Sequence, residues 1–122
     1  MVFMPEPEPR CRDGKLFMTA GSPGGSRIPT AVLQVILNVV DFGMNVQEAV
    51  DAPRIHHQWL PDRLSLERLI SPDTVALLKS MGYDTDYAPG IVWPSVETIL
   101  NDGGWLQGAS DERRAGGKAA GY

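Results

Sequence analysis

A run of glycines between two apolar segments constrains this chain more than any other feature. Residues 21–26 read Gly-Ser-Pro-Gly-Gly-Ser, after the short apolar run 15–20 and before a long apolar stretch over 27–42. A strand-to-helix turn of this kind exposes backbone N–H groups, and the helix dipole favours negative charge there. The sequence therefore predicts either an anion or oxyanion site at Gly24 and Gly25, or a tight turn that needs glycine only for its geometry.

The segments around the glycines predict a mixed α/β chain. The run 15–20 suits a strand buried on both faces, and 27–42 suits a helix buried nearly all round, with Ser26 as its N-cap. Asn45 and Glu48 form a capping-box pattern at the start of a short helix. The remaining expected elements are a strand at 64–67, a helix from Ser71 to about Met81 with Val75, Leu78 and Met81 on its apolar face, and a hairpin over 95–109 that turns at 101–104.

Composition excludes several classes of function. The 122 residues carry a net charge of −4 with scattered Lys and Arg, which argues against nucleic acid as a partner. The one cysteine, Cys11, excludes an internal disulfide and a thiolate-rich zinc site, and it is predicted to be a bystander. No apolar run reaches the roughly 18–20 residues that span a bilayer. Residues 1–12, with alternating Pro and Glu over 5–9, predict irregular extended structure and no export signal.

The hydroxyl groups near the glycines do not form a recognisable nucleophile site. Ser22 and Ser26 flank the glycines, and Thr30 lies within the expected helix. The sequence around Ser22 lacks the Gly-x-Ser-x-Gly spacing of a nucleophile elbow, and Pro23 directly after it cannot donate the N–H which that elbow requires. Ser26 is better explained as a cap. No nucleophile is therefore assigned within this chain.

Two further clusters of polar residues have a chemical and a structural interpretation. His56 and His57 can supply a base or metal ligands, with Asp62 nearby, but no third ligand has a recognisable spacing. We expect instead that both rings pack beside Trp59 and bond to the backbone, so no metal site is predicted. Residues 111–114, Asp-Glu-Arg-Arg, form either an ion-pair cluster or a solvated tail, and the solvated tail is the simpler expectation.

Several short motifs follow one another along residues 13–122. They are the glycine motif at 21–28, then Asn45–Ala49, Ala52–Arg54, His56–Asp62, Gly108–Asp111 and Ala120–Tyr122. In this order and spacing they resemble the gamma-glutamyltransferases, also called gamma-glutamyltranspeptidases or glutathione hydrolases. We therefore predict a non-homologous stretch over 1–12 and the C-terminal part of a small-subunit domain over 13–122, with no other clear boundary.

The resemblance implies an incomplete N-terminal-nucleophile hydrolase, a fold of stacked αββα layers. In that family a precursor cuts itself into a large and a small subunit, and the small subunit begins with a threonine whose own amine acts as the base. The threonine attacks the gamma-glutamyl carbonyl of glutathione or a related amide, and the acyl group passes to water, an amino acid or a peptide. By the resemblance, the amides of Gly24 and Gly25 form the oxyanion hole and contact the substrate, and no cofactor is implied.

Two family features have no counterpart in these residues. The nucleophilic threonine belongs to a segment upstream of the similarity, and the paired serines that hold the glutamyl carboxylate are replaced by the Phe-Met-Pro-Glu-Pro-Glu of residues 3–8. We therefore expect a truncated or frameshifted product that is inactive alone, with the large subunit and the N-terminal part of the small subunit as partners. The family is usually periplasmic, secreted or at the cell surface. The alternative is a non-catalytic module that binds a carboxylate or a protein through the glycine turn.

Overall fold

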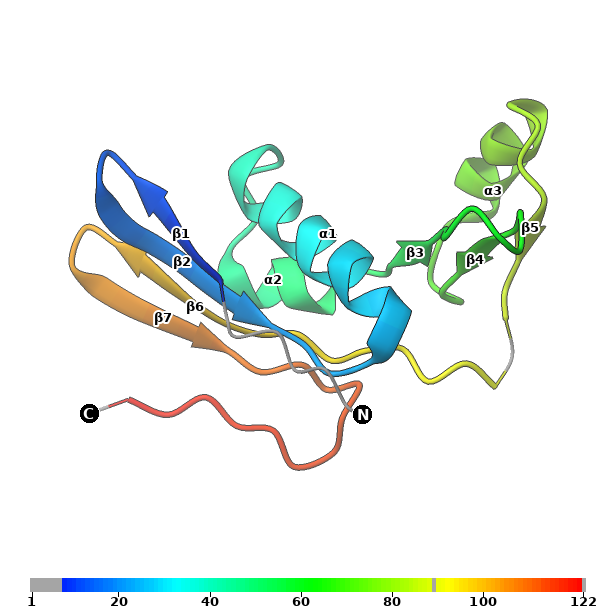
Figure 1. The fold of residues 1–122 in the computed structure, drawn as a ribbon. Coiled ribbons are helices and arrows are strands. Elements are labelled where there is room, and N and C mark those ends of the chain that lie inside the picture. Colours follow the sequence, from blue (N-terminus) through cyan, green and yellow to red (C-terminus); the bar gives the residue numbers. More distant parts are fainter. Residues whose placement is uncertain (1–7, 89, 122) are drawn as a thin grey trace. The chain divides into compact units, whose positions relative to one another are not determined.

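The computed structural model describes residues 8–88 and 90–121, and the chain divides into two compact units (Figure 1). The first unit comprises residues 1–52 and 93–122, and the second comprises residues 53–92. The sequence predicts no boundary at either junction. The boundary predicted at Asp13 separates residues that resemble the family from residues that do not, and it stays a prediction. Residues 3–8, which stand in place of the family's paired serines, lie mostly outside the described residues.

The first unit combines one antiparallel sheet with helices on one of its faces (Figure 1). The strand order is β1-β2-β6-β7, and each strand is antiparallel to its neighbour. The elements are β1 (Glu8–Arg12), β2 (Lys15–Gly21), the 3-10 helix η1 (Gly25–Arg27), α1 (Ile28–Val40), α2 (Val46–Asp51), β6 (Glu97–Asp102) and β7 (Trp105–Ala109). The strands predicted at 15–20 and within 95–109 are thus confirmed.

Strand β1 corrects one expectation about the N-terminal residues. Glu8–Arg12 is not irregular, because it pairs with β2 through a two-residue turn at Asp13 and Gly14, both with positive φ. This turn conformation matches the twist of a hairpin. Pro9 is compatible with the strand because β1 lies at the edge of the sheet, where a missing N–H leaves no interior ladder bond unmade.

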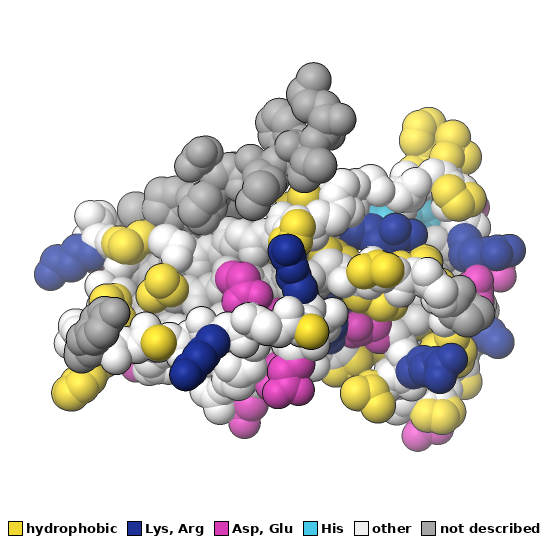
Figure 2. Space-filling view, turned by 90° about the horizontal axis from the view of Figure 1, so that it is seen from below, with side chains coloured by type: hydrophobic (Ala, Val, Ile, Leu, Met, Phe, Trp, Pro, Cys, Tyr) yellow, Lys and Arg dark blue, Asp and Glu magenta, His cyan; other side chains and the backbone are white. Residues whose placement is uncertain are grey.

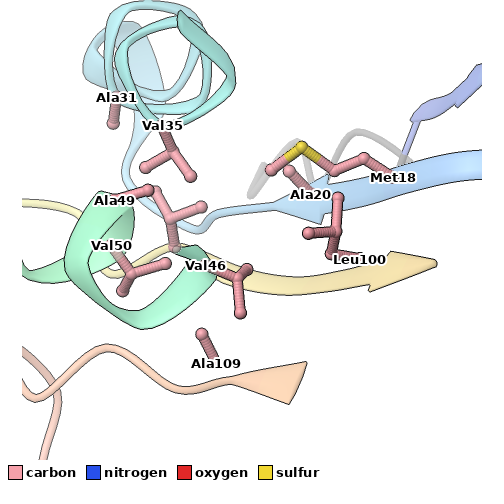
Figure 3. Packing of buried hydrophobic residues seen from close by; sticks show 10 residues of the cluster. Met18, Ala20, Ala31, Val35, Val46, Ala49, Val50, Leu100 and Ala109 are labelled. Atoms are coloured by element: carbon pink, nitrogen blue, oxygen red, sulfur yellow. The ribbon is translucent and has the colours of Figure 1, made fainter. Parts of the chain in front are cut away.

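The core of the first unit lies between the sheet and the two helices. Met18, Ala20 and Leu100 point from the sheet toward Val35 of α1 and Val46 of α2, as Figure 3 shows. Burial alternates along β2, so the expected burial on both faces is wrong for this strand. The reason is that the helices of this unit cover one face of an antiparallel sheet, which buries every second side chain.

Helix α1 is less buried than its composition predicts. Only Ile28, Ala31 and Val35 are fully buried, whereas 53% of Leu33 and 58% of Val40 are exposed. The helix packs on β2 and α2 within its unit, and that covers a single side of it. The predicted N-cap is also wrong: η1 precedes α1, the cap position of α1 falls on Arg27, and no side chain caps it. Pro29 lies in the first turn, as predicted.

The short helix α2 begins as the sequence predicts. The Asn45 side chain accepts a hydrogen bond from the Glu48 amide at 2.9 Å, and the Glu48 carboxylate accepts one from the Asn45 amide at 3.2 Å. Two backbone donors at the helix start are thereby satisfied in a complete capping box. In addition, Asn38 of α1 donates its side-chain amide to the carbonyl of Ala49 at 3.1 Å, which fixes one helix against the other.

The second unit is a small sheet with one helix. It contains β3 (Ile55–His56), β4 (Leu64–Leu66), α3 (Pro72–Ser80) and β5 (Thr85–Asp86), in the strand order β3-β4-β5. Leu64, Leu66 and Val75 form its core. Ser71 caps α3 as predicted, accepting a bond from the Thr74 amide at 3.2 Å. The predicted apolar face of α3 holds for Val75 and Leu78 but not for Met81, which is 64% exposed because it lies beyond the helix end.

The surface carries many hydrophobic side chains. Figure 2 shows them at several separate places on the face that it draws, with charged side chains between them. Trp105 and Leu106 of β7 are mostly exposed, as is Phe42 just after α1. None of the helices among the described residues is long and apolar enough to cross a membrane.

Candidate active site

The glycine turn connects β2 directly to the helical segment. Gly24 has φ 136° and Gly25 has φ 64°, backbone conformations that residues with a Cβ rarely adopt. Both glycines are exposed, and η1 starts at Gly25 and continues into α1. The hydrogen bonds described for turns, loops and caps include none donated by the amide of Gly24 or Gly25. Two exposed glycines therefore lie at the N-terminal end of a helical segment, where backbone donors stabilise negative charge.

The surroundings of the two glycines differ. A Cβ placed on Gly24 would lie 2.8 Å from the Cβ of Pro94, so only glycine fits against this proline. A Cβ on Gly25 would meet nothing within 4 Å. Pro94 is buried and thus forms one wall of the turn, while the space beside Gly25 is open. The turn thus joins Gly24, which packs against Pro94, to Gly25, which has open space beside it.

The hydroxyl groups near the turn have structural roles. Ser22 is buried, and its Oγ donates to the carbonyl of Pro23 at 2.9 Å. Thr30 donates its Oγ1 to the carbonyl of Arg27 at 3.1 Å, in the first turn of α1. Ser26 is exposed and lies within η1 rather than at a cap position. Arg27, at the end of η1, adds positive charge within three residues of both glycines.

The two adjacent histidines do not form a metal centre with the described residues, among which no group of three or more potential ligands occurs. Instead, the buried His56 ring bonds to the side chain of Gln58 at 3.0 Å. The His57 ring accepts the Trp59 amide at Nδ1, at 3.1 Å, and its Nε2 lies 3.1 Å from Asp62 Oδ1. Because Nδ1 is an acceptor, neutral His57 carries its proton on Nε2 and donates it to Asp62. The backbone bond that we expected is present for His57, and Trp59 itself is exposed.

The buried Asp111 and the partly buried Arg113 form a cluster that the sequence did not lead us to favour. The Asp111 carboxylate is 1% exposed: Oδ2 accepts the Val96 amide at 2.8 Å, and Oδ1 accepts the Arg113 guanidinium at 3.1 Å. Arg113 also donates to the carbonyls of Val50 and Ala52, both at 2.9 Å. The expected solvated tail is therefore wrong for these two residues. Asp111 lies two residues after the end of β7, and nothing in the neighbouring sequence predicts its burial.

An open cavity among the described residues lies away from the glycine turn. It is bounded by the turns of the β1–β2 and β6–β7 hairpins, with Arg12, Lys15 and Asp102 at its edge. Neither glycine lines it, and its lining includes no histidine, serine, threonine or cysteine. The cavity therefore shares no residue with the glycine turn and is not part of the candidate site.

Comparison with known proteins agrees with the motif pattern. The family model described as Gamma-glutamyltranspeptidase matches residues 7–121. The glutathione hydrolase proenzyme of Escherichia coli K12 is 47% identical over 112 residues, covering 91% of this chain and 19% of that protein. The glutathione hydrolase proenzyme of Pseudomonas sp. strain A14 is 43% identical over 120 residues, covering 91% and 21%. The chain thus spans about a fifth of the length of these curated relatives.

Solved structures resemble the fold over nearly the whole chain. A gamma-glutamyltranspeptidase T380A mutant from Helicobacter pylori has a TM-score of 0.83 at 41% identity, covering 93% of this chain and 62% of that chain. Gamma-glutamyltranspeptidase from Pseudomonas nitroreducens, complexed with L-DON, has a TM-score of 0.85 at 34% identity, covering 100% and 64%. These likenesses confirm the expected fold class, a mixed α/β chain that is part of an N-terminal-nucleophile hydrolase fold.

Proposed function

The chain belongs to the gamma-glutamyltranspeptidase family, and we propose that residues 13–122 act as the C-terminal part of a small subunit that supplies the oxyanion hole. In this proposal the amides of Gly24 and Gly25 donate to the carbonyl oxygen of a gamma-glutamyl amide such as glutathione. The observation that carries it is the pair of exposed glycines at the start of a helical segment, with Pro94 packed against Gly24.

The reaction places a specific demand on these amides. When a threonine hydroxyl adds to the gamma-glutamyl carbonyl, the oxygen becomes negatively charged and needs donors aimed at its new position. A preorganised donor of this kind is typically worth about 2.7–4 kcal/mol in the transition state. Collapse of the intermediate expels the amine and leaves an acyl-enzyme, which water or an acceptor amine then attacks. The same two amides serve both addition steps, because each passes through an oxyanion.

The nucleophile and the glutamyl-binding serines are expected from other parts of the enzyme. Ser22 and Thr30 are bonded to nearby carbonyls, and neither is a suitable substitute for the threonine. We therefore propose that the 122 residues do not turn over a gamma-glutamyl substrate by themselves. They act together with a large subunit and with the N-terminal part of the small subunit.

A hybrid enzyme tests the proposal. In it, residues 13–122 replace the matched segment of the E. coli glutathione hydrolase, and hydrolysis of gamma-glutamyl-p-nitroanilide is measured. The key variant is Gly25→Ala, with Gly43→Ala as its matched control. Both glycines have φ 64°, both are exposed, and a Cβ at either would meet nothing within 4 Å. Alanine would therefore have to adopt the same positive φ in open space at either position, in two different parts of the fold.

The expected result is an active hybrid whose kcat falls roughly 10- to 100-fold with Gly25→Ala, because a small displacement of a donor is costly, and changes little with Gly43→Ala. Equal activities of the two variants, or a self-processed hybrid without turnover, would contradict the proposal. Turnover by the 122-residue chain alone would contradict its inactivity. Glutamate binding by the chain in calorimetry, together with an inactive hybrid, would favour the carboxylate-binding module instead.

A further inference from the structure

We infer that Asp111 is a positioning residue for the oxyanion hole, acting through Val96 and Pro94 without touching the substrate. The inference rests on the proposed function of Gly24 and Gly25. Asp111 follows the end of β7, whereas the glycines follow β2, so the two sites are far apart in the sequence. They are joined by the short segment that precedes β6.

The first link is the hydrogen bond from the Val96 amide to Asp111 Oδ2, at 2.8 Å. Both groups are inaccessible to water, since Val96 is 0% and Asp111 1% exposed. A bond from a backbone amide to a buried carboxylate is charge-assisted and is stronger than a neutral one. Loss of this acceptor would leave a buried backbone donor without its partner, so the Val96 backbone would have to move.

The second link runs from Val96 to the glycine turn. Pro94 precedes Val96 by two residues, and Pro94, Ser95 and Val96 are all buried. The Pro94 Cβ occupies the space where a Gly24 side chain would otherwise be, at 2.8 Å from an ideal Cβ. Because close-packed atoms transmit displacement, a shift at Val96 moves Pro94 and removes the support behind Gly24.

The third link holds Asp111 itself in place. Arg113 donates to Asp111 Oδ1 from its backbone amide at 3.0 Å and from its guanidinium at 3.1 Å. The same guanidinium donates to the carbonyls of Val50 and Ala52 at the end of α2. Cations are favourable at a helix C-terminus, so the pair is attached to a regular element rather than to a loose tail. The Asp111 carboxylate is thus held on α2 through Arg113, and it holds the 94–96 segment through its bond to the Val96 amide.

The test uses Asp111→Asn in the hybrid enzyme, with Glu112→Gln as the matched control. Asparagine keeps the shape of the side chain but replaces one acceptor oxygen by an NH2 donor group. That NH2 group faces either the Val96 N–H or the Arg113 donors, so one of these donors loses its acceptor. Glu112 is the exposed neighbour, and the control makes the same chemical change there. We expect Asp111→Asn to lower kcat roughly 10- to 100-fold, as donor misplacement does. We expect KM to change less than about threefold, because transition-state stabilisation is what is lost.

A double-mutant cycle with Pro94→Gly separates positioning from a general loss of stability. If Asp111 acts through Pro94, removal of the Pro94 side chain already loosens Gly24, and the combined loss in kcat is smaller than the product of the two single losses. Losses that multiply, or an unchanged kcat with Asp111→Asn, would overturn the inference.

Two further variants keep the outcomes distinct. Where Asp111→Asn does not fold, Asp111→Glu retains the carboxylate but displaces it by one methylene, and the same criteria on kcat and on coupling to Pro94 apply. Gly25→Ala in the same hybrid reports on the oxyanion hole itself. A loss with Gly25→Ala but none at Asp111 rejects the positioning role alone, whereas full activity of Gly25→Ala rejects the proposed function.

Discussion

Gly24 and Pro94 approach so closely that a Cβ on Gly24 would lie 2.8 Å from the Pro94 Cβ, a separation that real Cβ atoms essentially never show. The two residues lie 70 positions apart, and the contact joins the turn after β2 to the segment before β6. It explains why glycine is required at residue 24 for two independent reasons, its φ of 136° and the lack of space. At Gly25 only the positive φ, 64°, requires glycine.

This difference predicts a ranking of stability. Gly25→Ala is expected to lower the free energy of unfolding by about 1–2 kcal/mol, the cost of a left-handed conformation for a residue with a Cβ. Gly24→Ala adds overpacking against Pro94, typically about 1–3 kcal/mol. Thermal unfolding of the hybrid enzyme by calorimetry should therefore give the lower Tm for Gly24→Ala. Adding Pro94→Gly should recover part of that loss, and no recovery would show that the contact is unimportant.

The capping box at α2 predicts a local effect. Asn45→Ala removes the acceptor of the Glu48 amide and is expected to cost about 1 kcal/mol, while Asn45→Asp preserves an acceptor and should cost a few tenths at most. The measurement is again the unfolding temperature of the hybrid enzyme. Similar losses for both substitutions would show that the cap contributes nothing specific.

The buried pair of Asp111 and Arg113 predicts a large effect at one of two adjacent arginines. Arg113→Ala leaves a buried carboxylate without its cation and removes the donors to Val50 and Ala52, so about 3–5 kcal/mol of stability should be lost. Arg114→Ala changes an exposed residue and should stay within about 0.5 kcal/mol. Equal, small losses at both positions, measured by unfolding, would contradict the buried pair.

The exposed side of α1 predicts self-association of the 122-residue chain. Leu33 and Val40 are more than half exposed on a helix whose composition is that of a buried one. Uncovered apolar surface of this kind promotes association. Sedimentation should show oligomers or aggregates, and replacing Leu33 and Val40 by serine should reduce them more than the polar control Gln34→Ser. A monodisperse, cooperatively unfolding chain without any substitution would contradict the prediction.

Features encoded by neighbouring residues could be predicted from the sequence. The capping box of Asn45 and Glu48, the cap at Ser71 and the hairpin turn at 101–104 depend on residues within one turn of each other, and the structure confirms all three. The strand β2 and the position of the glycine turn followed from apolar runs and from the need of glycine for positive φ. The family followed from the order of several motifs.

Features that depend on partners far away in the sequence could not be predicted. An apolar helix such as α1 predicts burial, but how much of it is covered depends on which elements are present to pack on it. Asp111 resembles the start of a polar tail, and only its contacts with Val96 and Arg113 show that it is buried. The wall that Pro94 forms behind Gly24 is likewise invisible in the sequence, because nothing local in Trp-Pro-Ser-Val at 93–96 points to residue 24.

The most direct test of the central claim removes a single N–H group. Semisynthesis of the hybrid enzyme can replace the amide before Gly25 by an ester, which deletes the donor and leaves the glycine backbone otherwise intact. The same ester at Gly43, with its equal φ of 64°, is the control. We predict that the Gly25 ester lowers kcat roughly 10²–10³-fold, the usual effect of losing one oxyanion donor. A kcat equal to that of the Gly43 ester would contradict the assignment of this glycine turn as an oxyanion hole.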